Sequence, residues 1–121
     1  MDRLPRILGV LTAAYSVVII ARPEVLARPC GLTGPGGRAS AAVRTLIGGI
    51  GARDVAIGTA MALAKRGPAL QTAVAARVFC DVADAVVFGL QLPDRGQRPK
   101  IAAFALFWAG LCALSGRWSG R

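Results

Sequence analysis

Histidine is absent from this chain of 121 residues, and cysteine occurs only three times. Without histidine the chain can form no His-ligated zinc site, no Ser–His nucleophile and no imidazole proton relay. Cys30, Cys80 and Cys112 lack the spacing of metal ligands, and an odd number fits no closed set of disulfides. Phosphate-binding loops, dinucleotide-binding glycine motifs and nucleophile elbows are missing from the sequence as well. The sequence therefore predicts no metal and no cofactor.

Charged residues are also scarce. They make up 17% of the chain, while hydrophobic residues make up 55%. A soluble domain has about a quarter of its residues charged. This composition argues against a disordered chain, a collagen-like fibre and a disulfide scaffold. It predicts one apolar helical domain, residues 1–121, that lies in a membrane.

The formal net charge of +9 would suit a nucleic-acid partner, but the positions of the basic residues do not. Most of them lie at the ends of apolar runs, and together they form no single stripe. Spanning helices place basic side chains at their ends, where these side chains reach the lipid headgroups. Aromatic residues are few, at 6%, and nucleic-acid-binding motifs are missing. We expect a bilayer and a lipophilic small molecule or lipid as partners, and no nucleic acid.

The seven prolines all lie outside the apolar runs, and proline ends helices. They leave four segments of roughly 17 to 25 residues, the length that spans a bilayer as a helix: 4–21, 41–64, 68–92 and 100–116. Residues 22–40 form a long loop with one short turn near 24–27, and residues 65–67 form a tight turn. The predicted fold is all-α, a four-transmembrane-helix antiparallel bundle.

A soluble four-helix bundle is the main alternative to this fold. It would need a polar face on every helix. Residues 101–116 carry no charge, and residues 7–21 offer only Thr12, Tyr15 and Ser16. The first segment also lacks the cleavage pattern of a signal peptide, so we interpret it as a retained helix.

Orientation in the membrane does not follow from the sequence. An even number of spans places both termini on one side, and each side carries six basic residues, so the positive-inside rule chooses neither. We expect an integral protein of a bacterial cytoplasmic membrane. Its small-residue surfaces are compatible with a homodimer.

Five ionisable residues lie deep inside the second and third segments: Arg53, Asp54, Arg77, Asp81 and Asp84. An ionised side chain at mid-membrane costs at least about 2.5 kcal/mol and is usually functional or tightly paired. Arg77, Asp81 and Asp84 share one helix face. Asp54 lies at the matching depth on the neighbouring helix, on a face rich in glycine, while Arg53 points about 100° away from it. These residues predict one intramembrane cluster.

Three carboxylates and two guanidiniums leave one carboxylate without a cationic partner, and a carboxyl group in a low-dielectric site tends to keep its proton. Such a group can donate a proton to a substrate. We therefore predict acid/base catalysis on a lipophilic molecule, by isomerisation, epoxide opening or protonation-initiated cyclisation. Asp81 and Asp84 would be the acid/base pair. Arg77, Asp54 and Arg53 would complete the catalytic site.

Three further side chains are candidates for contact with the substrate: Tyr15, Phe88 and Gln91. Phe88 and Gln91 extend the charged face of their helix, and Tyr15 could donate a hydrogen bond into the cluster. We interpret Phe104, Phe107 and Trp108 as packing or lipid-facing residues. Two other functions stay open. The Arg/Asp pairs could be purely structural, as buried pairs often are, or the chain could be a small proton-linked transporter or binding protein.

The stretch from Leu46 to Gly58, with Gly51-Ala-Arg-Asp-Val-Ala-Ile-Gly58 inside it, resembles the Gly-x-Arg-Asp-x-x-x-Gly pattern of a family of small four-span membrane proteins of unknown function. Two further parts of the chain are similar to the same family: the residues Arg77, Asp81 and Asp84, and the stretch 23–26. The resemblance implies a four-helix membrane fold and no settled activity. In residue types alone, the chain is similar to membrane isomerases and terpene cyclases, and to the Asp-Arg-Asp set of limonene-epoxide hydrolases.

Overall fold

The structure, a computed structural model, describes residues 3–118. Its elements are α1 (Arg3–Ala21), α2 (Glu24–Ala27), α3 (Ala41–Leu63), α4 (Pro68–Gln91), α5 (Arg98–Ser115) and a final 3-10 turn, η1 (Gly116–Trp118). Within the described residues the only β-type pairing is an isolated bridge between Thr33 and Ala39. The all-α prediction is therefore confirmed. The four long helices agree with the predicted segments to within two residues, and α2 is the predicted turn at 24–27.

Local sequence signals explain where the long helices begin. The Ser40 side chain accepts a hydrogen bond from the backbone N–H of Val43 at 3.2 Å and so caps α3. Gly67 has a φ of 106°, a conformation that favours glycine, and Pro68 begins α4 directly after it. Pro99 lies in the first turn of α5. Each of these residues lies at the start of a helix and stabilises that helix start.

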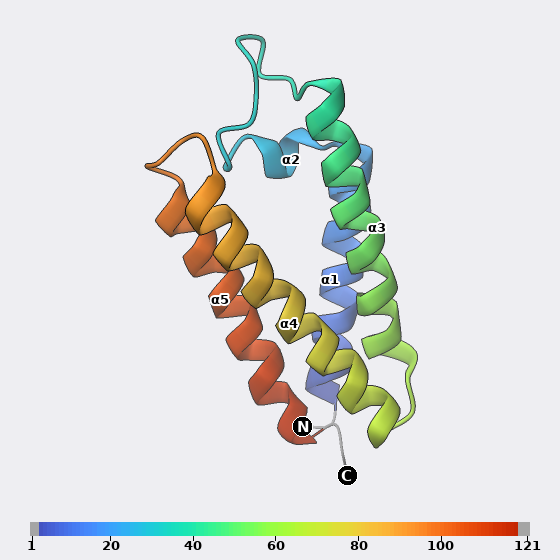
Figure 1. Cartoon of the computed structure of the whole chain (residues 1–121). Coiled ribbons are helices and arrows are strands. Elements are labelled where there is room, and N and C mark those ends of the chain that lie inside the picture. The colour runs from blue at the N-terminus through green and yellow to red at the C-terminus, as the bar shows by residue number, and fades with distance from the viewer. Residues whose placement is uncertain (1–2, 119–121) are drawn as a thin grey trace.

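The four long helices form two pairs. α1 packs mainly against α3, and α4 packs mainly against α5. The two pairs approach each other near the α3–α4 turn and separate towards α2 (Figure 1). α2 and the long loop after it lie at this wider end, across the space between the pairs.

Glycine allows α1 and α3 to touch backbone to backbone. A Cβ atom on Gly9 would lie 2.6 Å from the carbonyl oxygen of Gly58, and a Cβ on Gly58 would lie 2.6 Å from the carbonyl oxygen of Gly9. At Gly51 a Cβ would lie 2.5 Å from the Ile20 side chain. The glycines near Asp54 thus serve close approach of α1, as small residues do in membrane helix pairs.

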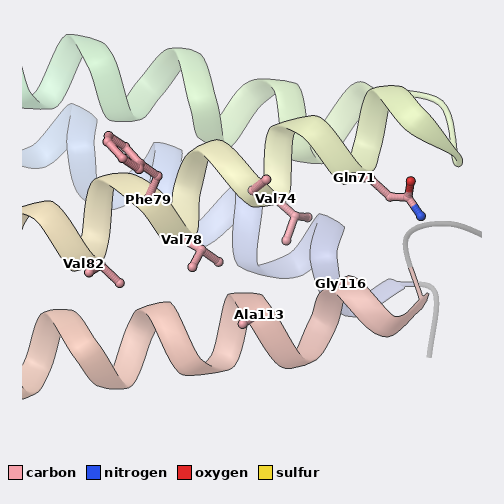
Figure 2. Close-up of a pocket in the computed structure, with 8 residues that line it drawn as sticks. Gln71, Val74, Val78, Phe79, Val82, Ala113 and Gly116 are labelled. Atoms are coloured by element: carbon pink, nitrogen blue, oxygen red, sulfur yellow. The ribbon is translucent and has the colours of Figure 1, made fainter.

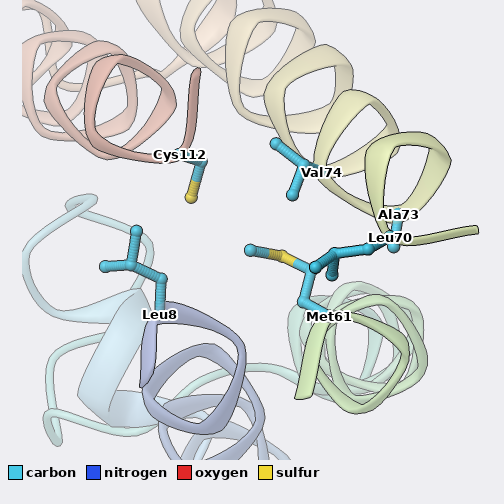
Figure 3. Packing of buried hydrophobic residues seen from close by; sticks show 6 residues of the cluster. All are labelled: Leu8, Met61, Leu70, Ala73, Val74 and Cys112. Carbon is cyan, nitrogen blue, oxygen red and sulfur yellow. The ribbon is translucent and has the colours of Figure 1, made fainter. Parts of the chain in front are cut away.

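One apolar cluster joins all four long helices at the narrow end. It contains Leu8 from α1, Met61 from α3, Cys112 from α5, and three residues of α4, namely Leu70, Ala73 and Val74 (Figure 3). Leu70, Met61 and Cys112 are fully buried. This cluster holds the two pairs together at one end and leaves their middle free for other side chains.

The outward faces of the helices are apolar. Leu63 is 77% exposed, Phe79 74% and Phe107 64%. By length and composition, α1 and α3 are apolar enough to cross a membrane. α4 carries Arg77, Asp81 and Asp84 within its length, and α5 begins with basic residues.

Candidate functional site

A cavity of about 550 Å³ lies between the two helix pairs. Residues of all four long helices line it, and Leu26 and Pro29 of the α2 region close it at the wider end. Four of its lining residues are also exposed: Pro29 at the wider end, Leu11 and Tyr15 on α1, and Phe104 on α5. The cavity therefore opens sideways between α1 and α5, which scarcely touch along their length.

The five ionisable residues form one chain of ion pairs beside this cavity. Arg77 Nη1 lies 2.9 Å from Asp54 Oδ1, and Arg77 Nη2 donates to Asp81 Oδ1 at 2.6 Å. Arg53 Nε donates to Asp54 Oδ1 at 2.8 Å. The two terminal nitrogens of Arg53 donate to the two carboxylate oxygens of Asp84, at 3.3 and 2.8 Å. The order is Asp81–Arg77–Asp54–Arg53–Asp84, so the predicted single cluster is present.

Arg53 differs from its sequence-based description. Its position, one residue from Asp54, predicts a direction about 100° away. The side chain instead folds back along α3 and crosses to Asp84 on α4. The long, flexible stem of arginine and its forked guanidinium make this bidentate contact attainable. Arg53 therefore links α3 to α4.

The expected carboxylate without a cationic partner is not present in that form. Asp54, Asp81 and Asp84 each contact at least one guanidinium. The three carboxylates and the two guanidiniums alternate in a line, and Asp54 Oδ1 contacts both guanidiniums. The excess of negative charge is thus spread over the chain of ion pairs.

Asp81 nevertheless keeps one oxygen free. Asp81 is 6% exposed and Arg77 is 1% exposed. Asp81 Oδ1 accepts from Arg77, whereas no group among residues 3–118 donates to the buried Asp81 Oδ2. Because a buried polar atom is normally hydrogen-bonded, this free oxygen needs an explanation. Asp81 lines the cavity, so a proton or a bound molecule can supply the partner.

The wall opposite the ion pairs carries a small polar network. Trp108 Nε1 on α5 donates to Thr12 Oγ1 on α1 at 3.1 Å. The Ser16 hydroxyl donates to the Thr12 carbonyl oxygen at 2.6 Å. All three residues line the cavity. The Trp108 bond is a direct polar link between the two helix pairs on this side.

The candidate substrate contacts divide into two groups. Tyr15 and Phe88 line the cavity. Gln91 is exposed and lies outside the cavity-lining residues, one turn beyond Phe88 at the end of α4. Phe104 and Trp108 also line the cavity. The sequence does not predict this, since nothing in α5 marks which of its faces meets α1.

The carboxylates of the cavity are engaged by arginine. Across residues 3–118, no three His, Cys, Asp or Glu side chains lie close enough together to hold a metal ion.

A second, shallower groove lies between α4 and α5, lined by residues such as Val78, Phe79 and Ala113 (Figure 2). It contains no ionisable side chain and so lacks the chemistry of the first cavity.

Comparison with protein-family models, curated proteins and solved structures finds no match to this chain. The resemblance of the stretch from Gly51 to Gly58 to a four-span family stays a prediction. The site alone supplies the chemical argument.

Proposed function

We propose that the chain is a four-span membrane protein whose central cavity performs acid/base chemistry on a lipophilic small molecule. The apolar outward faces support the membrane environment, because a soluble protein rarely exposes so many large side chains together. In the most apolar stretches of α1 and α3, only 33% and 22% of the residues are buried inside the protein. A core helix of a soluble protein would be mostly buried.

The observation that carries the acid/base proposal is the position of Asp81. Its side chain is buried, one of its oxygens has no hydrogen-bond partner among the described residues, and it lines an otherwise largely apolar cavity. The five charged groups neutralise one another when one carboxylate carries a proton. The free Asp81 Oδ2 is the position for that proton, from which it can be given to a ligand.

The other members of the cluster then have separate roles. Asp84 receives two hydrogen bonds from Arg53, which hold it ionised as the base. Arg77 holds Asp81 Oδ1 and leaves Oδ2 without a hydrogen bond from the described residues. Arg53 and Asp54 are positioning residues, because they act through Asp84 and Arg77.

This arrangement suits reactions that begin with protonation. An alkene that takes the proton of Asp81 becomes a carbocation, and loss of a neighbouring proton to Asp84 gives the isomerised or cyclised alkene. An epoxide oxygen that takes the same proton is opened by water, which gives its proton to Asp84. The sideways opening between Leu11, Tyr15 and Phe104 gives a molecule dissolved in the bilayer access to the cavity.

Isotope transfer from solvent tests this function without a known substrate. The protein in nanodiscs is incubated with a bacterial lipid extract in D₂O enriched in ¹⁸O, and the lipophilic molecules are analysed by mass spectrometry. We expect one class of molecules to gain deuterium or ¹⁸O. The label should disappear with Asp81→Asn, which keeps an acceptor for Arg77, and persist with Phe79→Leu on the outer face. Equal labelling by wild type and Asp81→Asn, or none at all, contradicts the proposal.

Purely structural pairing is the second candidate, and the unbroken line of ion pairs favours it. Buried ion pairs can fix helix register without any chemistry. In that case Asp81→Asn and Asp84→Asn should both lose the folded bundle in detergent, as read from the thermal unfolding curve. A folded but inactive Asp81→Asn protein points to the acid/base function.

A further inference from the structure

Aromatic side chains are concentrated around the cavity. The chain has four Phe, two Trp and one Tyr, and four of these seven residues line the cavity: Tyr15, Phe88, Phe104 and Trp108. They come from three different helices, α1, α4 and α5. The face of an aromatic ring attracts positive charge, and the attraction is larger where water is excluded.

The charges of the cluster favour the same kind of ligand. Three carboxylates and two guanidiniums have a net charge of −1 when all are ionised, and no other side chain that is charged at neutral pH lines the cavity among the described residues. Asp81 lines the cavity, and its Oδ2 atom is buried and has no hydrogen-bond partner among residues 3–118. A single positive charge inside the cavity neutralises the cluster, just as a proton on Asp81 does.

We propose that the cavity binds lipophilic molecules bearing one positive charge, with Asp81 as the counter-ion and the aromatic side chains around the charged group. This inference deepens the proposed function, since it concerns the same cavity and names its ligand class. A carbocation formed by protonation of a neutral substrate has the same charge. A site complementary to a stable monocation would therefore also stabilise such an intermediate.

Two molecules of the same shape test the inference. Benzyltrimethylammonium carries one positive charge, and neopentylbenzene replaces its nitrogen by carbon and is neutral. Binding to the detergent-solubilised full chain is followed by the fluorescence of Trp108, in a Trp118→Phe background. We expect the cation to bind at least about tenfold more tightly than the neutral molecule, after correction for partition into detergent.

Variants separate the contribution of charge from that of shape. Asp81→Asn should remove the preference for the cation and leave the affinity for neopentylbenzene unchanged. Phe104→Leu should weaken cation binding severalfold, whereas Phe107→Leu on the same helix should not, because Phe107 is similarly exposed but lies outside the cavity.

The outcomes distinguish this inference from the proposed function. Equal affinities for the two molecules overturn the cationic ligand class but leave isotope transfer to a neutral lipophile intact. Equal cation binding by wild type and Asp81→Asn also overturns it. Binding of neither molecule overturns the inference and counts against the cavity as a ligand site.

Discussion

Between α1 and α3 the backbones touch at Gly9 and Gly58, whereas the two helix pairs meet at mid-length through a chain of charged side chains. The first contact leaves no room even for a methyl group. The second lies beside a cavity of about 550 Å³. Glycine contacts give a tight pair that carries no chemistry, while the charged side chains join α3 to α4 next to the cavity.

The largest loss of stability is expected when a charge is removed from the chain of ion pairs between α3 and α4. Arg77→Met leaves the buried Asp81 without its cation and removes one of the two cations that contact Asp54. Breaking a buried ion pair from one side typically costs about 3–5 kcal/mol of unfolding free energy. Denaturant titration in detergent measures the change. A loss below about 1 kcal/mol, the level of an exposed pair, would show that water reaches the cluster.

The outward face provides a region with neither glycine contact nor charge. Phe107→Arg places a charge near the middle of α5, on a side chain that is 64% exposed. In a bilayer this substitution should cost about 2.5–3.5 kcal/mol and reduce the membrane-inserted fraction, while Phe107→Leu should not. In a soluble protein the same change would be within about 0.5 kcal/mol of neutral. Fractionation and unfolding in nanodiscs decide between these results.

A methyl group tests the glycine contact. Gly58→Ala places a Cβ 2.6 Å from the carbonyl oxygen of Gly9, and only backbone movement can relieve it. We expect a loss of about 1–3 kcal/mol, as for other overpacked sites. Gly48→Ala is the matched control on the same helix, because a Cβ there meets nothing within 4 Å. Similar stability of the two variants would contradict the backbone contact.

The smallest effect concerns the polar link across the cavity opening. Trp108→Phe removes the hydrogen bond from the indole N–H to Thr12 and keeps an aromatic ring. A loss of about 0.5–1.5 kcal/mol is expected, the usual value for one hydrogen bond. Thr12→Val should cost a similar amount, and the double variant should cost no more than either single change. Additive losses would mean that the two side chains do not interact.

The helices could be predicted from the sequence because proline marks their ends. Pro68 begins α4, and Pro99 lies in the first turn of α5. The charged cluster could be predicted because residues four apart share a face, as Arg77 and Asp81 do. Both signals act within one helix or across one short turn.

What could not be predicted depends on how helices approach one another. The bridge from Arg53 to Asp84 needs a side chain that folds away from its own face. The contact of Trp108 with Thr12 joins residues 96 positions apart. Neither the packing of α1 against α3 nor the exclusion of Gln91 from the cavity follows from periodicity, because periodicity defines the faces of a helix and not the neighbour that each face meets.

The central claim is that Asp81 carries a usable proton inside the cavity. Infrared spectroscopy of the protein in nanodiscs at neutral pH tests it most directly, through the C=O stretching band of a protonated carboxyl group. We predict one such band in the wild type, shifted on transfer to D₂O, absent from Asp81→Asn and retained in Phe79→Leu on the outer face. A spectrum without this band, or a band that Asp81→Asn retains, would contradict the claim.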